Sequence, residues 1–199
     1  MAGLHIKVLA EKLCTRMRSS PATNITVKTG TKVADIVAQI ARAAGGVKIN
    51  RLSLLAHGYA ETWSGGRNRF ANFTPNMPYS KQGGGYGLQL GEDIDRTSIT
   101  GFGALKPHLA PGAVIDVYAC FAADVSPDLP RASLIGDGEG TMRALAFATG
   151  AMVRASKSAH NFRSGGSWVD VGRFEGQVLQ FRPDGTIVPE QFSRVEDYD

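Results

Sequence analysis

Two short apolar segments, each followed by a chemically reactive side chain, constrain this chain most. The first, Arg51 to Ala56, is followed by His57 and Gly58. The second, Ala113 to Ala119, is followed by Cys120. Short apolar runs of this kind are typical of strands that are buried on both faces of a parallel sheet. Ligands and reactive groups collect at the carboxyl ends of such strands. The sequence therefore predicts an imidazole and a thiol at one edge of a sheet.

The pattern before these segments indicates an α/β fold. Strand-like residues at 4–10 and 24–28 precede residues 33–41, where apolar side chains recur at helical spacing. Thr31 is expected to be the N-cap of this helix, and Gly45-Gly46 is expected to end it. Together with the strand at 51–56 this reads β-α-β, which implies parallel strands joined by a right-handed crossover.

The later part of the chain continues this pattern and then changes it. A short strand is expected at 88–90, helices at 97–109 and 141–149, a turn at Pro111-Gly112 and a strand at 151–155. Residues 168–171, 177–181 and 186–188 alternate in polarity, with a turn signal at Pro183-Asp184-Gly185, so they predict antiparallel strands. We expect a mostly parallel sheet sandwiched by helices, with antiparallel strands added near the C-terminus.

Composition favours one ordinary globular domain. The chain has 199 residues, of which 43% are hydrophobic, and a formal charge of +4. Its Lys and Arg residues are scattered, so nucleic acid is not an expected partner. No apolar run is long enough to cross a membrane, and no Sec-type signal is visible. We expect a cytoplasmic protein, or one exported by another route. The two cysteines, Cys14 and Cys120, form no C-x-x-C pair, so a reducing compartment is the default.

The pairing of His57 with Cys120 suits nucleophilic catalysis. A thiol attacks well only as a thiolate, and a neighbouring imidazole removes its proton and later returns that proton to the leaving group. We assign Cys120 as the nucleophile and His57 as the general base and acid. The backbone N–H groups of Gly58 and Cys120 are expected to form an oxyanion hole. This chemistry requires neither a metal nor an organic cofactor.

Two alternative interpretations of these residues stay open. A buried Cys often serves as a small apolar side chain, and a His before a Gly is common where loops begin. The run Gly83 to Gly87, at the end of the long irregular region at 59–87, is interpreted as a flexible flap over the site.

Three segments resemble the caspase-like cysteine peptidases. They are LSLLAHG, which ends on His57 and Gly58, GLQLGEDI at 87–94, and VIDVYACFAAD, which contains Cys120. Residues 145–156 fit the helix and strand that follow in bacterial members. The resemblance implies a single caspase-like domain over residues 1–199, with its core at about 25–156 and a β-rich extension at about 167–189.

The same resemblance implies a function. The expected activity is a cysteine endopeptidase that uses a Cys–His dyad without an essential acid and acts on a peptide or protein substrate. The closest pattern is that of bacterial caspase-like and self-cleaving toxin domains. It therefore implies a bacterial effector or self-processing protease, and it leaves room for a polyanionic activator.

The sequence departs from the family at the expected substrate site. YACFA, at 118–122, is not the caspase QAC pattern, so cleavage after Asp is not expected. Members that cut after Arg or Lys place an Asp two residues before the Cys, where this chain has Tyr118. Asp116 lies two residues further back on the same strand face. We assign Asp116, Tyr118 and Trp63 as substrate contacts.

Two other functions remain as alternatives. One is a catalytically inactive caspase-like fold that serves as a binding or scaffold module. The other is a thiol hydrolase on an unrelated α/β fold, in which Cys120 would open a helix directly.

Overall fold

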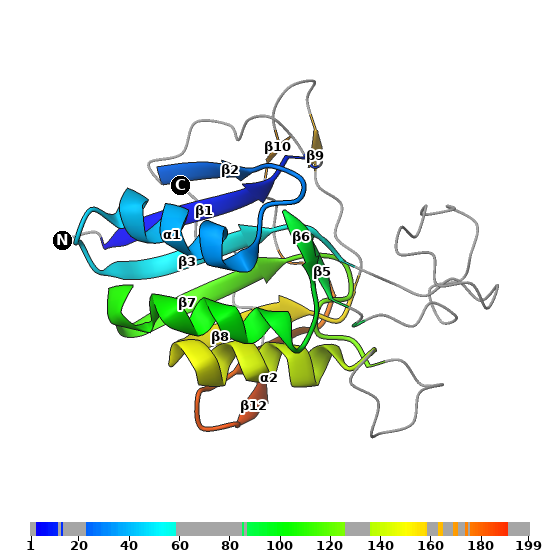
Figure 1. The fold of residues 1–199 in the computed structure, drawn as a ribbon. Helices are drawn as coiled ribbons and strands as arrows, with labels where there is room; N and C mark the ends of the chain where they lie inside the picture. Colours follow the sequence, from blue (N-terminus) through cyan, green and yellow to red (C-terminus); the bar gives the residue numbers. More distant parts are fainter. Residues whose placement is uncertain are drawn as a thin grey trace.

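A seven-stranded mixed sheet forms the centre of the structure (Figure 1). The computed structural model describes residues 3–11, 13, 23–58, 85, 87–125, 136–158, 163–164, 169–170, 174 and 176–190. The strand order is β12-β11-β8-β7-β3-β1-β2. The strands are β1 (Leu4–Ala10), β2 (Thr23–Val27), β3 (Ile49–Leu55), β7 (Leu109–Tyr118), β8 (Met152–Ser156), β11 (Val178–Phe181) and β12 (Ile187–Pro189).

The sheet is parallel except at one edge. Strands β2, β1, β3, β7 and β8 pair in parallel, whereas β11 pairs antiparallel with β8 and with β12. The predicted α/β class, with a mostly parallel sheet and antiparallel strands near the C-terminus, is confirmed. The strand order reverses direction at β1 and β3, and in such sheets ligands bind outside the carboxyl ends of the strands.

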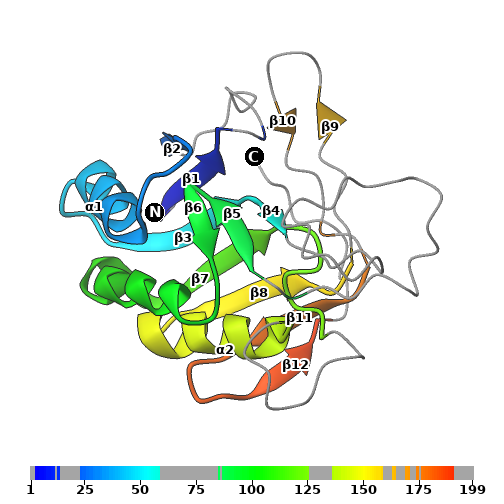
Figure 2. The same cartoon turned by 45° about the vertical axis from the view of Figure 1, so that its right-hand side comes forward.

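Two small antiparallel sheets lie apart from the central one. The first contains β4 (His57–Gly58), β5 (Leu88–Leu90) and β6 (Glu92–Ile94), and it lies beyond the carboxyl end of β3 (Figure 2). Gly91 connects β5 to β6 with a φ of 78°, a left-handed conformation that glycine adopts without steric cost. The second contains β9 (Arg163–Ser164) and β10 (Val169–Asp170).

The helices of the described part of the chain cover one face of the central sheet (Figures 1 and 2). They are α1 (Val33–Ala44), the 3₁₀ helix η2 (Ser98–His108) and α2 (Gly138–Thr149). Alternate residues of the strands face these helices because strand side chains point to opposite faces in turn. They form the main core, for example Leu52 and Leu54 of β3 with Ile115 and Val117 of β7. No helix among the described residues is long and apolar enough to cross a membrane.

The opposite face of the sheet mixes apolar and polar side chains. Leu9, Leu55, Tyr118, Phe174 and Val178 form a second, smaller apolar cluster. The strands also bury four polar residues whose positions alternate with the main core, namely Lys7, Ser53, Asp116 and Ser156. Buried polar groups need hydrogen-bond or charge partners, and this face supplies them for Ser53 and Asp116, as described below.

Two local predictions were wrong. Lys32, not Thr31, is the N-cap of α1, and the Thr31 hydroxyl donates to the Lys28 carbonyl oxygen instead (2.7 Å). The predicted turn at Pro111-Gly112 lies inside β7, where the pairing with β3 shifts between Ile49 and Arg51. The helix predicted at 97–109 is present and takes the 3₁₀ form (Ser98–His108). Its two glycines and Pro107 disfavour a regular α-helix.

Candidate active site

Strands β3 and β7 bring His57 and Cys120 to the same level at one edge of the sheet. These strands are hydrogen-bonded neighbours, and their register pairs Ser53 with Asp116 and Leu55 with Tyr118. The pairing continues past the end of β3, where the Ala56 N–H donates to the Tyr118 carbonyl oxygen (3.0 Å). The same register, extended by two residues, aligns position 57 with position 120. The predicted base and nucleophile therefore follow adjacent strand ends.

Gly58 lies in direct contact with the backbone of Cys120. A Cβ atom on Gly58 would overlap the Cys120 carbonyl oxygen, and it would lie 2.7 Å from the carbonyl carbon and 2.9 Å from the nitrogen. Both separations are shorter than about 3.5–4 Å, the usual separation of non-bonded carbon atoms in contact. Only glycine fits at position 58. The structure thus brings together the two backbones predicted to form the oxyanion hole, with His57 exposed and Cys120 half-buried.

The turn after Cys120 is fixed by backbone hydrogen bonds. Phe121 and Ala123 donate their N–H groups to the carbonyl oxygens of Ser158 and Ser156 (both 3.0 Å), beyond and at the end of β8. Phe121 has a φ of 54° and is the non-glycine residue with a positive φ in the described part of the chain. The left-handed conformation costs an L-residue about 1–2 kcal/mol, and such strain clusters at functional sites. The backbone that carries Cys120 is therefore held in one conformation.

The β4–β5 pair places an unpredicted residue, Gln89, directly opposite His57. The antiparallel register pairs His57 with Gln89 and Gly58 with Leu88. Directly opposite residues present their side chains on one face of the ribbon, with Cβ atoms about 4.5–5.5 Å apart. Gln89 is 7% exposed and lies beside an exposed histidine. The sequence signal was a Gln between two leucines at 88 and 90.

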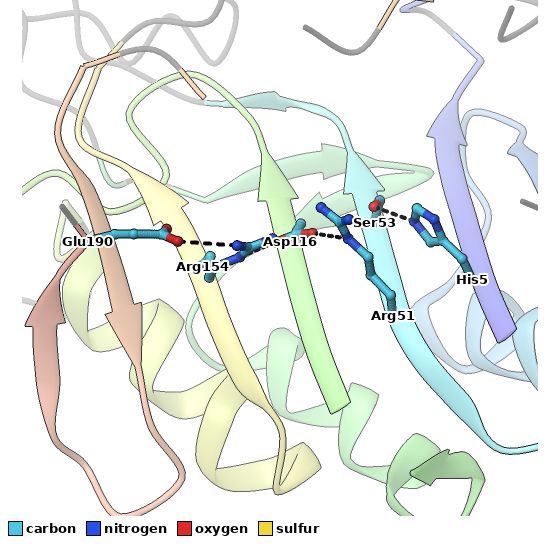
Figure 3. Close-up of polar contacts among 6 residues, drawn as sticks. All are labelled: His5, Arg51, Ser53, Asp116, Arg154 and Glu190. Carbon is cyan, nitrogen blue, oxygen red and sulfur yellow. Dashed lines mark hydrogen bonds and ion pairs between the residues drawn. The ribbon is translucent and has the colours of Figure 1, made fainter. Parts of the chain in front are cut away.

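Asp116 does not face solvent, because two arginines of the neighbouring strands enclose it (Figure 3). Its carboxylate accepts from Arg51 Nε (2.7 Å) and from Arg154 Nε (2.6 Å), and its side chain is 0% exposed. Arg154 also pairs with Glu190 (3.2 Å). The basic side chains that Asp116 binds are thus the chain's own. Its predicted role as a substrate contact has no geometric support in this arrangement.

Glu190, Arg154, Asp116 and Arg51 form a row of paired polar side chains across the sheet, and Ser53 of β3 and His5 of β1 extend it (Figure 3). One ring nitrogen lies 2.9 Å from the Ser53 hydroxyl. Burial, together with the positive charges of Arg51 and Lys7, lowers the pKa of His5 to about 4, although Asp116 acts in the opposite direction. His5 is therefore neutral at pH 7 and belongs to the support of the sheet.

Tyr118 and Trp63 complete the predicted substrate contacts. Tyr118 is 1% exposed and stacks on Phe174 at a centroid distance of 4.4 Å and an interplanar angle of 18°. Arg154 lies over the same Phe174 ring, 6.0 Å from its centroid. Tyr118 thus packs in the second apolar cluster, where burial separates it from solvent. Trp63 lies outside the described residues.

The described part of the predicted flap packs close to the turn after Cys120. Gly85 is buried with a φ of 82°, and a Cβ atom there would overlap the Asp124 carbonyl oxygen and the Gly138 nitrogen. The Gly138 N–H in turn donates to the Asp124 carbonyl oxygen (2.8 Å). Gly85 is therefore part of the packed support of the turn. Residues 83, 84 and 86 of the same run lie outside the described residues.

The ends of β3 and β7 place His57 and Cys120 at one edge of the sheet, with the backbones of Gly58 and Cys120 in contact. Among the described residues, no group of three or more His, Cys, Asp or Glu side chains is arranged to hold a metal ion. No family model, curated protein sequence or solved structure compared with the chain matches it. The function of this chain is therefore inferred from the arrangement of the site.

Proposed function

We propose that this chain is a cysteine hydrolase that cleaves a peptide bond, with Cys120 as nucleophile and His57 as general base and acid. The observation that carries the proposal is the contact of Gly58 with the Cys120 backbone. A packed site keeps this contact only if position 58 has no side chain. It places the residue next to His57 against the residue that bears the thiol.

The proposed reaction proceeds in two acyl-transfer steps. His57 takes the Cys120 thiol proton, and the thiolate adds to the substrate carbonyl carbon. The oxyanion that forms is stabilised by the backbone N–H groups of Gly58 and Cys120. His57 then returns the proton to the leaving amine as the C–N bond breaks, which leaves a thioester on Cys120. Water, deprotonated by His57, hydrolyses the thioester and releases the carboxylic acid.

The fold supports this proposal at the level of architecture. The base and the nucleophile follow the ends of adjacent parallel strands, the edge where active sites form in open α/β sheets. A caspase-like family, self-processing and a polyanionic activator are parts of the same proposal that rest on the sequence resemblance alone.

The decisive test is the rate at which iodoacetamide labels Cys120 as a function of pH. The experiment uses a Cys14→Ala background, so that one thiol is followed, and compares it with His57→Ala. His108→Ala is the matched control, since His108 lies at the end of η2. Labelling that persists well below the ordinary thiol pKa of about 8.5, and is lost in His57→Ala alone, would support an activated pair.

The opposite result is equally informative. A profile that rises only near pH 8.5, and is indifferent to His57 with or without added polyphosphate, would overturn the proposal in favour of a binding module. If the thiol is activated, a peptide library read by mass spectrometry identifies the bond cleaved, with Cys120→Ala as the blank.

A further inference from the structure

The peptide unit that joins Cys120 to Phe121 is held from two sides. Its N–H, that of Phe121, donates to the Ser158 carbonyl oxygen (3.0 Å), beyond the end of β8. Its C=O, that of Cys120, lies against Gly58, where a Cβ atom would overlap the oxygen. The N–H and the C=O of a trans peptide point in opposite directions. Ser158 and Gly58 therefore fix this peptide unit between them, and Gly58 directly follows His57.

The backbone of Ser158 is in turn fixed by the hydroxyl of Ser156. The Ser156 Oγ accepts from the Ser158 N–H (2.9 Å), and the Ser156 carbonyl oxygen accepts from the Ala123 N–H (3.0 Å). Serine side chains stabilise turns by such bonds to the backbone N–H two residues further along. A third bond, from the Lys157 N–H to the Gln177 carbonyl oxygen (3.0 Å), joins this turn to the residue before β11. The end of β8 is thus a hydrogen-bonded turn with defined carbonyl positions.

Ser156 is completely buried, and its position alternates with those of the main core. Buried strand positions usually carry apolar residues, because a polar group there needs a partner. The Ser158 N–H is such a partner for the hydroxyl. The turn that this bond stabilises supports a strained residue, since Phe121 has a φ of 54°. Strained residues persist only where surrounding contacts hold them, so the conformation after Cys120 depends on the hydrogen bonds to the end of β8.

We infer that Ser156 is a positioning residue for Cys120, an inference that rests on the proposed function. Its hydroxyl fixes the Ser158 carbonyl oxygen, which holds the Cys120 backbone against Gly58. Without the hydroxyl, the strained turn relaxes and the thiol loses its alignment with His57. An imidazolium favours the thiolate only at close range. Loss of the Ser156 hydroxyl therefore raises the thiol pKa toward its ordinary value.

The test measures the pH profile of Cys120 labelling by iodoacetamide in variants of the Cys14→Ala protein. Ser156→Ala removes the hydroxyl, and Ser156→Thr keeps it. Ser53→Ala is the matched control, because Ser53 is buried on the same face of the sheet and bonds His5 instead. We expect Ser156→Ala to lower labelling at pH 6 roughly tenfold, which corresponds to a rise of about one unit in the thiol pKa. Ser156→Thr and Ser53→Ala retain the parent profile.

Thermal unfolding of each variant separates a loss of fold from a loss of positioning. Ser156→Ala and Ser53→Ala each lose a buried hydrogen bond, so both are expected to be less stable than the parent, but only the first changes the profile. A folded Ser156→Ala variant with the parent profile, or an equal change in Ser53→Ala, overturns the inference. So does a folded Ser156→Thr variant with the profile of Ser156→Ala.

A second variant covers the case in which Ser156→Ala does not fold. Ser158→Pro removes the N–H donor of the same hydrogen bond and leaves the Ser156 hydroxyl in place, and we expect a similar loss of labelling at pH 6. The parent profile in folded Ser158→Pro overturns the inference while the activated thiol of the parent stands. Absence of activation in the parent itself overturns the proposed function, so the two failures are distinguishable.

Discussion

Gly58 and Cys120 touch backbone to backbone, although 61 residues separate them in the chain. The contact leaves no room for a Cβ atom at position 58. It links the two strand ends that carry the predicted base and nucleophile. Its removal is therefore the most direct structural test of the site.

Gly58→Ala is expected to disrupt the site. The added methyl group overlaps the Cys120 carbonyl oxygen, so β4 and the strand end at Cys120 must separate, at a cost of about 1–3 kcal/mol. Cys120 labelling at pH 6 should fall to the level of His57→Ala. Gly103→Ala is the control, because its nearest contact would be 3.2 Å, to the Ala148 carbonyl oxygen. Parent-like labelling in Gly58→Ala would contradict the contact.

Asp116→Asn is expected to destabilise the fold by about 3–5 kcal/mol, because it removes the buried charge that two arginines share. Chemical denaturation measures the free energy of unfolding. Glu190→Gln is the control: its carboxylate pairs with Arg154 at the partly exposed end of the row, where a pair contributes about 0–1 kcal/mol. If both substitutions lowered the free energy of unfolding equally, the buried charge of Asp116 would not be the main stabilising group among these ion pairs.

The free energy of unfolding should fall as the pH decreases from about 6.5 toward 4, in part because of His5. Burial and neighbouring positive charge lower its pKa in the folded state to about 4, whereas an unfolded chain has a histidine pKa of about 6.5. The unfolded state therefore binds more protons in this window, and protonation favours unfolding. Above pH 6.5 this contribution is complete.

His5→Gln measures this contribution because the glutamine can still bond the Ser53 hydroxyl without titrating. Denaturation at pH 7.5 and pH 4.5 should show a smaller loss of stability in His5→Gln than in the parent, since the carboxylates contribute equally to both. An equal loss in the two proteins would mean that His5 titrates normally in the folded state.

Phe121→Gly is expected to be more stable than Phe121→Ala by about 0.5–1 kcal/mol. Both changes remove the same buried ring, but only glycine adopts the φ of 54° without strain. Thermal unfolding of the two variants measures the difference. The usual order, with alanine the more stable, would show that the turn relaxes when the ring is lost.

The sequence was sufficient to predict the sheet and the ends of its central strands. The apolar runs of β3 and β7 marked two buried strands, and the first polar or reactive residue after each run marked its carboxyl end. The helix α1 was predicted because its buried side chains recur at Val33, Ile36, Val37 and Ile40. These signals depend only on residues close together in the chain, so they can be recognised in a single sequence.

The partners of Asp116 could not be predicted, because they depend on register. Arg51 and Arg154 reach it from β3 and β8, and no local pattern states which residues of separate strands are aligned. The position of Gln89 was missed for a related reason. The strand at 88–90 was predicted, but its partner β4 has only two residues, too few to show a period, so no pattern aligned Gln89 with His57.

The buried carboxylate of Asp116 also determines which register of β7 against β3 is stable. A slip of β7 by one residue against β3 would turn Asp116 toward the helix-covered apolar face, because alternate residues change sides. It would also shift Cys120 about 3.3 Å from its place beside Gly58. A slip of one residue thus removes both the ion pairs of Asp116 and the contact of Cys120 with Gly58. A molecule with the native register therefore keeps both the ion pairs of Asp116 and the contact of Gly58 with Cys120.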